Sequence, residues 1–141
     1  MFFFGTFEHS IDERGRIAIP ASYRRAFVDG GVVRPGPDGC LEIYTQETFD
    51  QEAQRRLDSE DGNRRRSARR TRRGFMHDAY SLELDRQGRV LVPGPLRNDV
   101  NIDGRVALVG CGDYIEIWDP ERWTQELERV ANEEQDEEAA E

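Results

Sequence analysis

A ten-residue stretch occurs twice in this chain and limits the folds that the chain can adopt. The stretch from Ile11 to Pro20 reads I-D-E-R-G-R-I-A-I-P, and the stretch from Leu84 to Pro93, 73 residues later, reads L-D-R-Q-G-R-V-L-V-P. Because a chain of 141 residues buries a single core, the two copies cannot be independent domains. We therefore expect them to share one core as two halves of one unit.

Each copy of the stretch predicts a strand, a turn and a return strand. The strand positions expected on the apolar face are Phe7, His9 and Ile11 in the first copy and Tyr80, Leu82 and Leu84 in the second. The turns, 12–15 and 85–88, begin with an aspartate that can accept backbone N–H bonds and end with a glycine that can adopt a positive φ. We expect a hairpin in each copy, with return strands 17–19 and 90–92 that are apolar at every position and covered on both faces.

Further elements follow each hairpin. Proline ends each return strand, and we expect a short helix at 20–27 and a single helical turn at 93–97. Strands 32–33 and 40–44 should pair, as should 106–109 and 114–118. Two helices should then pack through apolar stripes formed by Phe49, Ala53 and Leu57 and by Trp123, Leu127, Val130 and Ala131. The predicted class is mainly β with short helices, α+β.

The negative charge of the chain is concentrated at its end. The formal net charge is −9, and residues 128–141 carry seven acidic side chains against Arg129. All basic residues are arginine. Because the rest of the chain is nearly balanced and the local field decides which partner binds, the net charge does not argue against a nucleic-acid partner.

Several classes of function are disfavoured by what the sequence lacks. Cys40 and Cys111 stand apart, and His9 and His77 have no nearby cluster of ligands, so we expect no metal site and no cofactor. No nucleotide-binding loop or nucleophile motif is present, so we expect neither an enzyme nor a small-molecule substrate. No segment approaches the roughly 18 apolar residues of a membrane span, so we expect a cytoplasmic protein without a membrane partner.

The paired turns, the M-F-F-F-G-T start and the segments L-E-I-Y (Leu41 to Tyr44) and I-E-I-W (Ile115 to Trp118) together resemble the MraZ family, from residue 1 to about 130. The family consists of bacterial regulators with two AbrB-type (SpoVT-AbrB) swapped-hairpin β-α-β repeats. The resemblance implies two repeats interleaved into one pseudo-two-fold barrel, with helices in the connector and at the C-terminus. It also implies a repressor of the division and cell-wall gene cluster, including its own gene, that binds short direct repeats in promoter DNA. A ring-like homo-oligomer associated with the nucleoid is expected.

In that family a D-x-x-x-R motif contacts DNA, which corresponds here to Asp12 with Arg16 and to Asp85 with Arg89. A guanidinium at such a tip can reach a phosphate or bind a guanine edge with two hydrogen bonds. We expect each aspartate to form the turn and to orient its arginine through an ion pair without touching DNA itself. The full set of expected DNA-binding residues is Asp12, Arg14, Gly15, Arg16, Asp85, Arg86, Gly88 and Arg89.

The segment between the repeats departs from the family pattern. Residues 64–73 contain seven arginines and almost no apolar stripe, which puts the usual helical packing of this connector in doubt. The arginines could form a solvated face, act as a basic arm on the DNA backbone, or contact the acidic tail within or between protomers. The residues of the second alternative are Arg64, Arg65, Arg66, Arg69, Arg70, Arg72 and Arg73.

The expected organisation has four parts. The first repeat spans residues 1–52 with its core at about 5–47, and the second spans 77–127 with its core at about 77–120. The Arg-rich connector spans 53–76 and the acidic tail 128–141. An AbrB-like antitoxin, or another protein-interaction module, is the alternative function. The acidic tail would then hold a protein partner, although two repeats in one chain favour the regulator.

Overall fold

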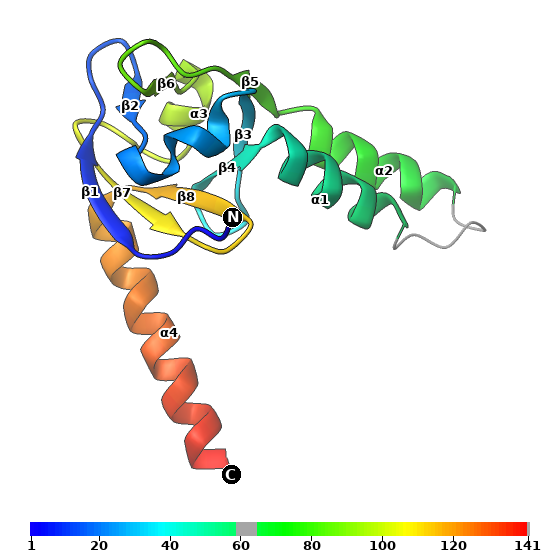
Figure 1. The fold of residues 1–141 in the computed structure, drawn as a ribbon. Coiled ribbons are helices and arrows are strands. Elements are labelled where there is room, and N and C mark those ends of the chain that lie inside the picture. The colour runs from blue at the N-terminus through cyan, green and yellow to red at the C-terminus, as the bar shows by residue number, and fades with distance from the viewer. Residues whose placement is uncertain (59–64, 141) are drawn as a thin grey trace.

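The chain forms two sheets that are joined by short helices (Figure 1), and the computed structural model describes residues 1–58 and 65–140. The elements in chain order are β1 (Thr6–Ser10), β2 (Arg16–Ala18), the 3-10 helix η1 (Ala21–Phe27), β3 (Gly31–Pro35), β4 (Leu41–Thr45), α1 (Gln46–Asp58), α2 (Arg65–Met76), β5 (Tyr80–Leu82), β6 (Arg89–Leu91), α3 (Gly94–Asp99), β7 (Arg105–Gly110), β8 (Tyr114–Trp118) and α4 (Pro120–Ala140). The predicted α+β class, mainly β with short helices, is confirmed.

The order of the strands shows that the two repeats are interleaved. One sheet has six strands in the order β1-β7-β8-β4-β3-β5, and the other is the two-stranded β2–β6 ribbon. The counterparts in the two repeats are β1 and β5, β3 and β7, and β4 and β8. Exchanging each strand with its counterpart gives the same order read from the opposite edge of the sheet. The two halves are therefore related by a pseudo-two-fold axis.

Two pairs of equivalent residues mark where this axis passes. Ile17 lies opposite its counterpart Val90 in the β2–β6 ribbon. In the centre of the larger sheet, Glu42 on β4 lies opposite Glu116 on β8. Both pairings are antiparallel, as a two-fold axis perpendicular to paired strands requires. The duplicated sequence thus produces a symmetric body within one chain.

Two expectations about strand pairing are wrong. The strands on either side of each turn do not form a regular hairpin with each other, because β1 pairs with β7 and β2 pairs with β6. Only an isolated bridge between Ile11 and Ile17 joins the two strands across the first turn. The expected barrel is not closed either, because β1 and β5 form the two edges of an open sheet. The swapped arrangement itself, which the family resemblance implied, is present.

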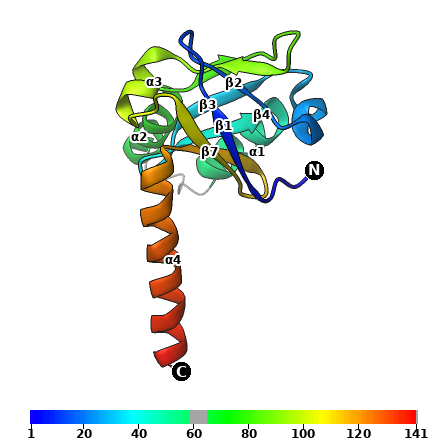
Figure 2. The same cartoon turned by 90° about the vertical axis from the view of Figure 1, so that its left-hand side faces the viewer.

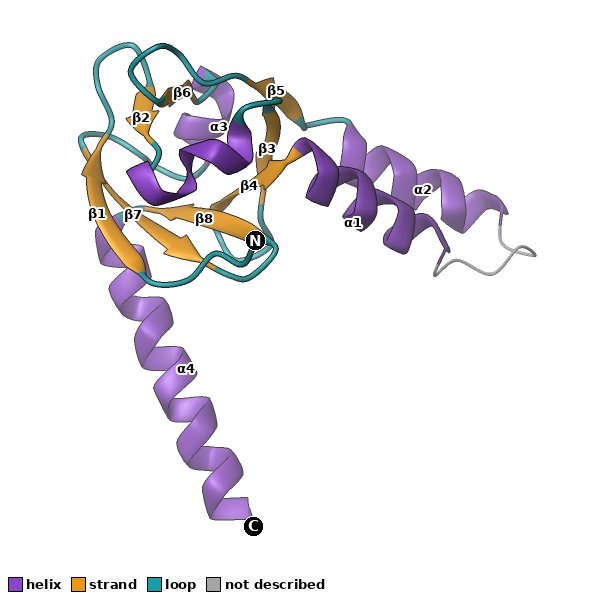
Figure 3. Cartoon of the chain, viewed as in Figure 1, coloured by secondary structure: helices purple, strands orange, loops and turns teal. Residues whose placement is uncertain are grey.

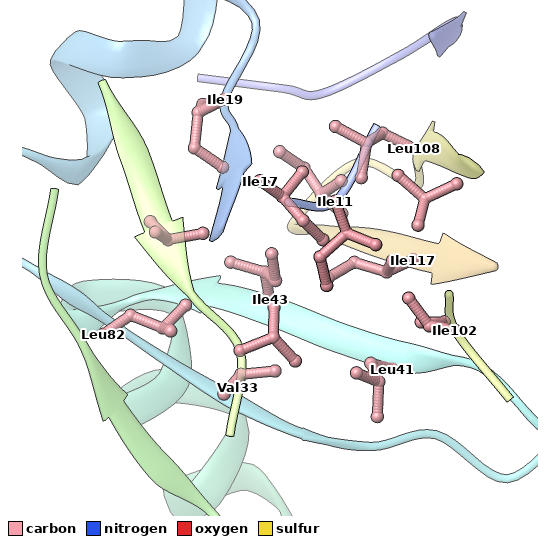
Figure 4. Packing of buried hydrophobic residues seen from close by; sticks show 14 of the residues in the cluster. Ile11, Ile17, Ile19, Val33, Leu41, Ile43, Leu82, Ile102, Leu108 and Ile117 are labelled. Atoms are coloured by element: carbon pink, nitrogen blue, oxygen red, sulfur yellow. The ribbon is translucent and has the colours of Figure 1, made fainter. Parts of the chain in front are cut away.

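The main core lies between the six-stranded sheet and the β2–β6 ribbon. Figure 4 shows Ile17 and Ile19 from the ribbon side of the core packing towards Ile43 and Ile117 from the central strands of the sheet. All four side chains have no exposed surface. Burial of such side chains contributes about 1.5–3 kcal/mol each. The ribbon is therefore fixed to the body through its inner face.

The outer face of the ribbon remains open to solvent. Ile17 and Val90 point inward, and side chains alternate along a strand. Ala18 is only half-buried, and Leu91 is 51% exposed. The expectation that the return strands are covered on both faces is therefore wrong for the β2–β6 ribbon. The exposed Leu91, which lies on β6 opposite Arg16 of β2, is available for contact with a partner.

The Arg-rich connector packs despite its composition. Helix α2 lies beside α1 (Figure 3), and a second cluster of buried residues joins the two helices to the outer face of the sheet. Phe75 stacks on Phe49 with ring centroids 5.3 Å apart. The guanidinium groups of Arg34 and Arg56 lie 4.4 Å and 4.3 Å from the centre of the Phe75 ring. The contacts of Phe75 with Phe49 and with two guanidinium groups thus supply the packing that the arginine run lacks.

Helix α4 projects from the body and leaves part of its apolar stripe uncovered (Figures 1 and 2). Trp123 packs on Trp118 with ring centroids 5.5 Å apart. One turn further on, Leu127 is 48% exposed, and Val130 is 43% exposed. The expectation that this whole stripe packs inside the protein is wrong beyond Trp123.

Candidate nucleic-acid interface

Both copies of the turn have the same hydrogen-bonded geometry. In the first turn, one carboxylate oxygen of Asp12 accepts backbone N–H bonds of 2.9 Å from both Arg14 and Arg16. In the second, Asp85 accepts bonds of 2.8 Å from Gln87 and 2.9 Å from Arg89. The predicted role of each aspartate as turn-former is confirmed.

Glycine closes each turn in a conformation that other residues resist. Gly15 has a φ of +85° and Gly88 a φ of +76°, in the left-handed region. The carbonyl of Gly15 accepts a 2.8 Å bond from the N–H of Val92, and the carbonyl of Gly88 accepts a 2.9 Å bond from Ile19. Each turn is therefore fastened to the return strand of the other repeat.

Two arginines that the sequence analysis did not single out cover these glycines. Arg24 donates a 3.0 Å hydrogen bond from Nε to the carbonyl of Ile19, and a Cβ on Gly88 would overlap its side chain. In the same way, a Cβ on Gly15 would lie 2.8 Å from Cζ of Arg97. Each arginine belongs to one repeat and covers the turn of the other. The sequence contained a signal for this pair. Arg24 and Arg97 are 73 positions apart, which is the same spacing as that between the two turns.

An ion-pair cluster crosses between the repeats. Arg89 contacts Asp85 through Nε at 3.2 Å, and it also contacts Asp12 of the other turn through Nη1 at 3.3 Å. The expected pairing of each aspartate with its own arginine holds for Asp85. For Asp12 it is wrong, because the ion-pair partner of Asp12 is Arg89. Within the described residues Arg16 forms no ion pair.

The arginines of the ribbon share its outer face. In the register of β2 and β6, Arg16 lies opposite Leu91, and Arg89 lies opposite Ala18. These four side chains point away from the core because Ile17 and Val90 point into it. Arg16 and Arg89 are diagonal neighbours on this face, with backbones roughly 7–8 Å apart. The outer face of the ribbon is therefore a small surface that combines two guanidinium groups with the side chains of Ala18 and Leu91.

The tips of both turns lie at one edge of the molecule. Figure 1 shows the two loops at the top of the body beside β2 and β6, and Figure 2 shows them flanking the ribbon. Arg14 and Arg86 are exposed, Arg16 and Arg89 are half-buried, and Gly15 and Gly88 are buried beneath them. The structure therefore brings the predicted residues of both turns together on one surface, which also carries Arg24 and Arg97 underneath.

The connector arginines lie elsewhere. Helix α2 projects from the opposite end of the body to β1 in Figure 1, away from the two tips. Arg64 lies outside the described residues, and Arg65 and Arg66 form the start of α2. The side chains that are described and exposed are those of Arg69, Arg70, Arg72 and Arg73. The two groups of arginines form separate surfaces on one molecule.

Acidification should weaken both turns. Backbone hydrogen bonds from Arg16 and Arg89 lower the pKa of Asp12 and Asp85, respectively. A lowered folded-state pKa gives stability that is complete above the unfolded value of about 3.9 and is lost as pH falls through the folded-state value. We expect the melting temperature to fall below about pH 4, and to fall less steeply in the Asp12→Asn/Asp85→Asn variant, whose amide oxygens still accept backbone N–H bonds. Identical curves for both proteins, measured by circular dichroism, would contradict this.

The described residues show neither a metal-binding cluster nor a membrane-spanning helix. Among residues 1–58 and 65–140, no group of three histidine, cysteine, aspartate or glutamate side chains could hold a metal ion. The same residues contain no helix with the length and apolar character needed to cross a bilayer.

Comparison with known proteins gives a consistent result. A family model described as "MraZ protein, putative antitoxin-like" matches residues 2–73 and 75–141. A protein of Thermomicrobium roseum named "Transcriptional regulator MraZ" is 39% identical over 133 residues, which cover 93% of this chain and 91% of that protein. Proteins with the same name from Lachnoclostridium phytofermentans and Lactiplantibacillus plantarum are each 40% identical. The matches cover 86% and 92% of this chain and 84% and 92% of those proteins.

Proposed function

The chain belongs to the MraZ family, and we propose that it is a DNA-binding transcriptional regulator that reads DNA with the outer face of its β2–β6 ribbon. The observation that carries the proposal is that the fold places both turns, and the arginines of both, on one exposed surface. The names of the relatives support regulation of transcription. They describe no enzyme, and we propose no catalytic role.

The ribbon has the right shape for the major groove of DNA. That groove is about 12 Å wide and accepts a two-stranded β-ribbon. Arg16 and Arg89 would point into it, where a guanidinium can bind O6 and N7 of guanine with two hydrogen bonds. Leu91 and Ala18, between them, offer apolar contact to a thymine methyl group. Arg14 and Arg86 at the tips would bind the flanking phosphates.

The aspartates hold the arginines and do not read bases. Arg89 uses Nε and one Nη1 hydrogen bond for Asp85 and Asp12, so three of its five N–H donors remain for DNA. A fixed guanidinium loses little side-chain freedom on binding. The carboxylates would be repelled by phosphate and therefore stay behind the arginine.

The family resemblance also supports a proposal for the target and the assembly. We propose repression of the division and cell-wall gene cluster that includes the protein's own gene, through short direct repeats in the promoter. One protomer offers few base contacts, so a ring-like homo-oligomer at the nucleoid, in the cytoplasm, would place several protomers on successive repeats. Linked binding raises affinity without new contacts. Repeats roughly one helical turn apart, about 10 base pairs, would face the same side of the duplex.

A gel-shift titration on the DNA directly upstream of the gene tests this function. We expect a shifted complex that unlabelled upstream DNA displaces and that a shuffled duplex of equal length does not displace. The affinity should fall as salt rises, with a slope of about −0.9 per phosphate contacted. Equal displacement by both competitors would show that the protein binds DNA without reading sequence, and no complex at low salt would refute DNA binding.

The second candidate is an antitoxin-like protein that sequesters a protein partner. The description of the matching family model includes the words "antitoxin-like", and helix α4 projects from the body beyond Trp123, leaving Leu127 and Val130 exposed. Recovery of a stoichiometric protein partner in a pull-down, together with no retention of promoter DNA, would favour this function over the regulator.

A further inference from the structure

Helix α2 presents a broad face of arginine. Positions 69, 70, 72 and 73 fall within one side of a helix of 3.6 residues per turn. On the other side, Ser67, Ala68 and Thr71 are half-buried and Phe75 is buried. Arg69, Arg70, Arg72 and Arg73 are exposed and form no ion pairs with other described residues. Exposed Met76 continues the arginine face at the end of α2 that is nearer the body.

Helix α4 presents a face of complementary character. Near the body this face carries Leu127 and Val130, which are exposed although apolar. At the same helical spacing it continues into Glu134, Glu137 and Glu138, all exposed. The face is therefore apolar next to the body and acidic towards the tip. This order matches α2, which has methionine near the body and arginine further out.

Both helices carry charge that opposes their own dipole. The first turn of α2 contains arginine and no acidic residue, although a helix N-terminus favours negative charge. The last turn of α4 is acidic and contains no basic residue, although a C-terminus favours positive charge. The free end of α2 therefore lacks the acidic side chains that α4 carries, and the free end of α4 lacks the basic side chains that α2 carries. An antiparallel pair would supply both.

We infer that α4 of one molecule docks antiparallel on the arginine face of α2 of a second molecule. Residues 127–138 of α4 have the same length as the 12 residues of α2, about 18 Å of helix. In this arrangement Leu127 and Val130 would cover Met76, and the glutamates would lie over the arginines. The inference rests on the proposed homo-oligomer and names the contact that builds it.

The partner is a second copy because the chain cannot make this contact with itself. In Figures 1 and 2, α4 and the α1–α2 pair leave the body in different directions. The same acidic side chains would compete with a DNA backbone for the arginines of α2. Self-association and DNA binding by α2 are therefore alternatives that one set of variants can separate.

Charge exchange tests the contact in the full-length protein. One variant carries Arg69→Glu and Arg73→Glu on α2, and another carries Glu134→Arg and Glu138→Arg on α4. By sedimentation without DNA in about 0.05 M salt, where charges are weakly screened, each variant alone should self-associate at least about tenfold more weakly than the wild type. A mixture of the two should regain wild-type assembly, because each acidic helix then meets a basic one.

A matched control lies on the opposite side of the same helix. Glu128→Arg with Asp136→Arg makes the same change in net charge as the α4 variant but points away from the proposed face. This variant should assemble like the wild type, and wild-type assembly should weaken in about 1 M salt, where the screening length is about 3 Å. If self-association weakened equally in the control and in the α4 variant, the inference would be overturned.

The remaining outcomes decide between the proposals. A wild-type protein that stays monomeric would refute both the homo-oligomer and this contact. Assembly that is unchanged in the α2 and α4 variants, or is not rescued in the mixture, refutes the contact alone. If Arg69→Glu/Arg73→Glu assembles normally but binds promoter DNA more weakly, the arginine face is a DNA-backbone arm and the inference is wrong. Gel shifts on the same samples measure the regulator function separately.

Discussion

Replacing both Arg16 and Arg89 by alanine is expected to weaken operator binding at least roughly 30-fold, because each lost base contact costs about 1–3 kcal/mol. The two side chains lie on the solvent face of the ribbon, where their removal exposes no core. The melting temperature should therefore change little. Affinity is measured by gel shift or fluorescence anisotropy at one fixed salt concentration, since the phosphate contribution varies with salt.

Arginine at another exposed position provides the control for that result. Arg25 is exposed on η1, beside Met1 and Thr45 and away from the turns. Arg25→Ala removes one exposed positive charge, against two in the double variant, and should leave operator affinity within about twofold of the wild type. Replacement of Arg16 and Arg89 by lysine keeps the charge but not the two parallel hydrogen bonds, and it should reduce discrimination against the shuffled duplex. Wild-type affinity in the double alanine variant would show that the ribbon does not bind DNA.

Substitution of Gly15 is expected to cause a large loss of stability. A left-handed φ costs any other residue about 1–2 kcal/mol, and a Cβ on Gly15 would also lie 3.0 Å from the Val92 carbonyl oxygen and 2.8 Å from Arg97. The Val92 N–H bond to Gly15 would have to shift as well. Gly15→Ala should therefore lower the free energy of unfolding by about 2–5 kcal/mol, and Gly15→Val by more, because a β-branched residue resists this conformation further.

A substitution at Gly104 distinguishes the cost of backbone strain from the cost of steric overlap. Its φ is +75°, but nothing lies within 4 Å of a Cβ built there. Gly104→Ala should therefore cost only the conformational strain, about 1–2 kcal/mol. Urea unfolding of both variants gives the comparison. Equal losses at the two positions would mean that Gly15 is needed only for its φ and that the contacts across the repeats contribute nothing.

The sequence predicted local structure well because local structure repeats. Two identical patterns of aspartate, glycine and arginine indicated two turns, and apolar segments indicated the strands β3–β4 and β7–β8 that pair within each repeat. The partners of β1 and β2 could not be obtained in this way. A strand satisfies the same hydrogen bonds with a neighbour in its own repeat or in the other, so only the family resemblance indicated the exchange.

The ion-pair cluster shows the same limit at the level of one side chain. Spacing within a turn placed Asp12 beside Arg16, and the backbone of Arg16 does bond to Asp12. The side chain that reaches Asp12 comes from Arg89 instead, because the exchange brings β6 next to β2. The packing of α2 was missed for a related reason. It depends on the single residue Phe75 with distant Arg34 and Phe49, which no periodic pattern in the connector reveals.

Proximity of the turns to bound DNA tests the central claim most directly. Burial raises the thiol pKa of Cys40, and it raises that of Cys111 to about 12, so a cysteine introduced on the surface can be labelled selectively with a DNA-cleaving chelate. Glu13 and Gln87 are exposed within the two turns, and Gln54 is exposed on α1. With promoter DNA bound, reagents at Glu13→Cys and Gln87→Cys should cleave at the operator, and the reagent at Gln54→Cys should not. Cleavage from Gln54→Cys without cleavage from either turn would contradict the account.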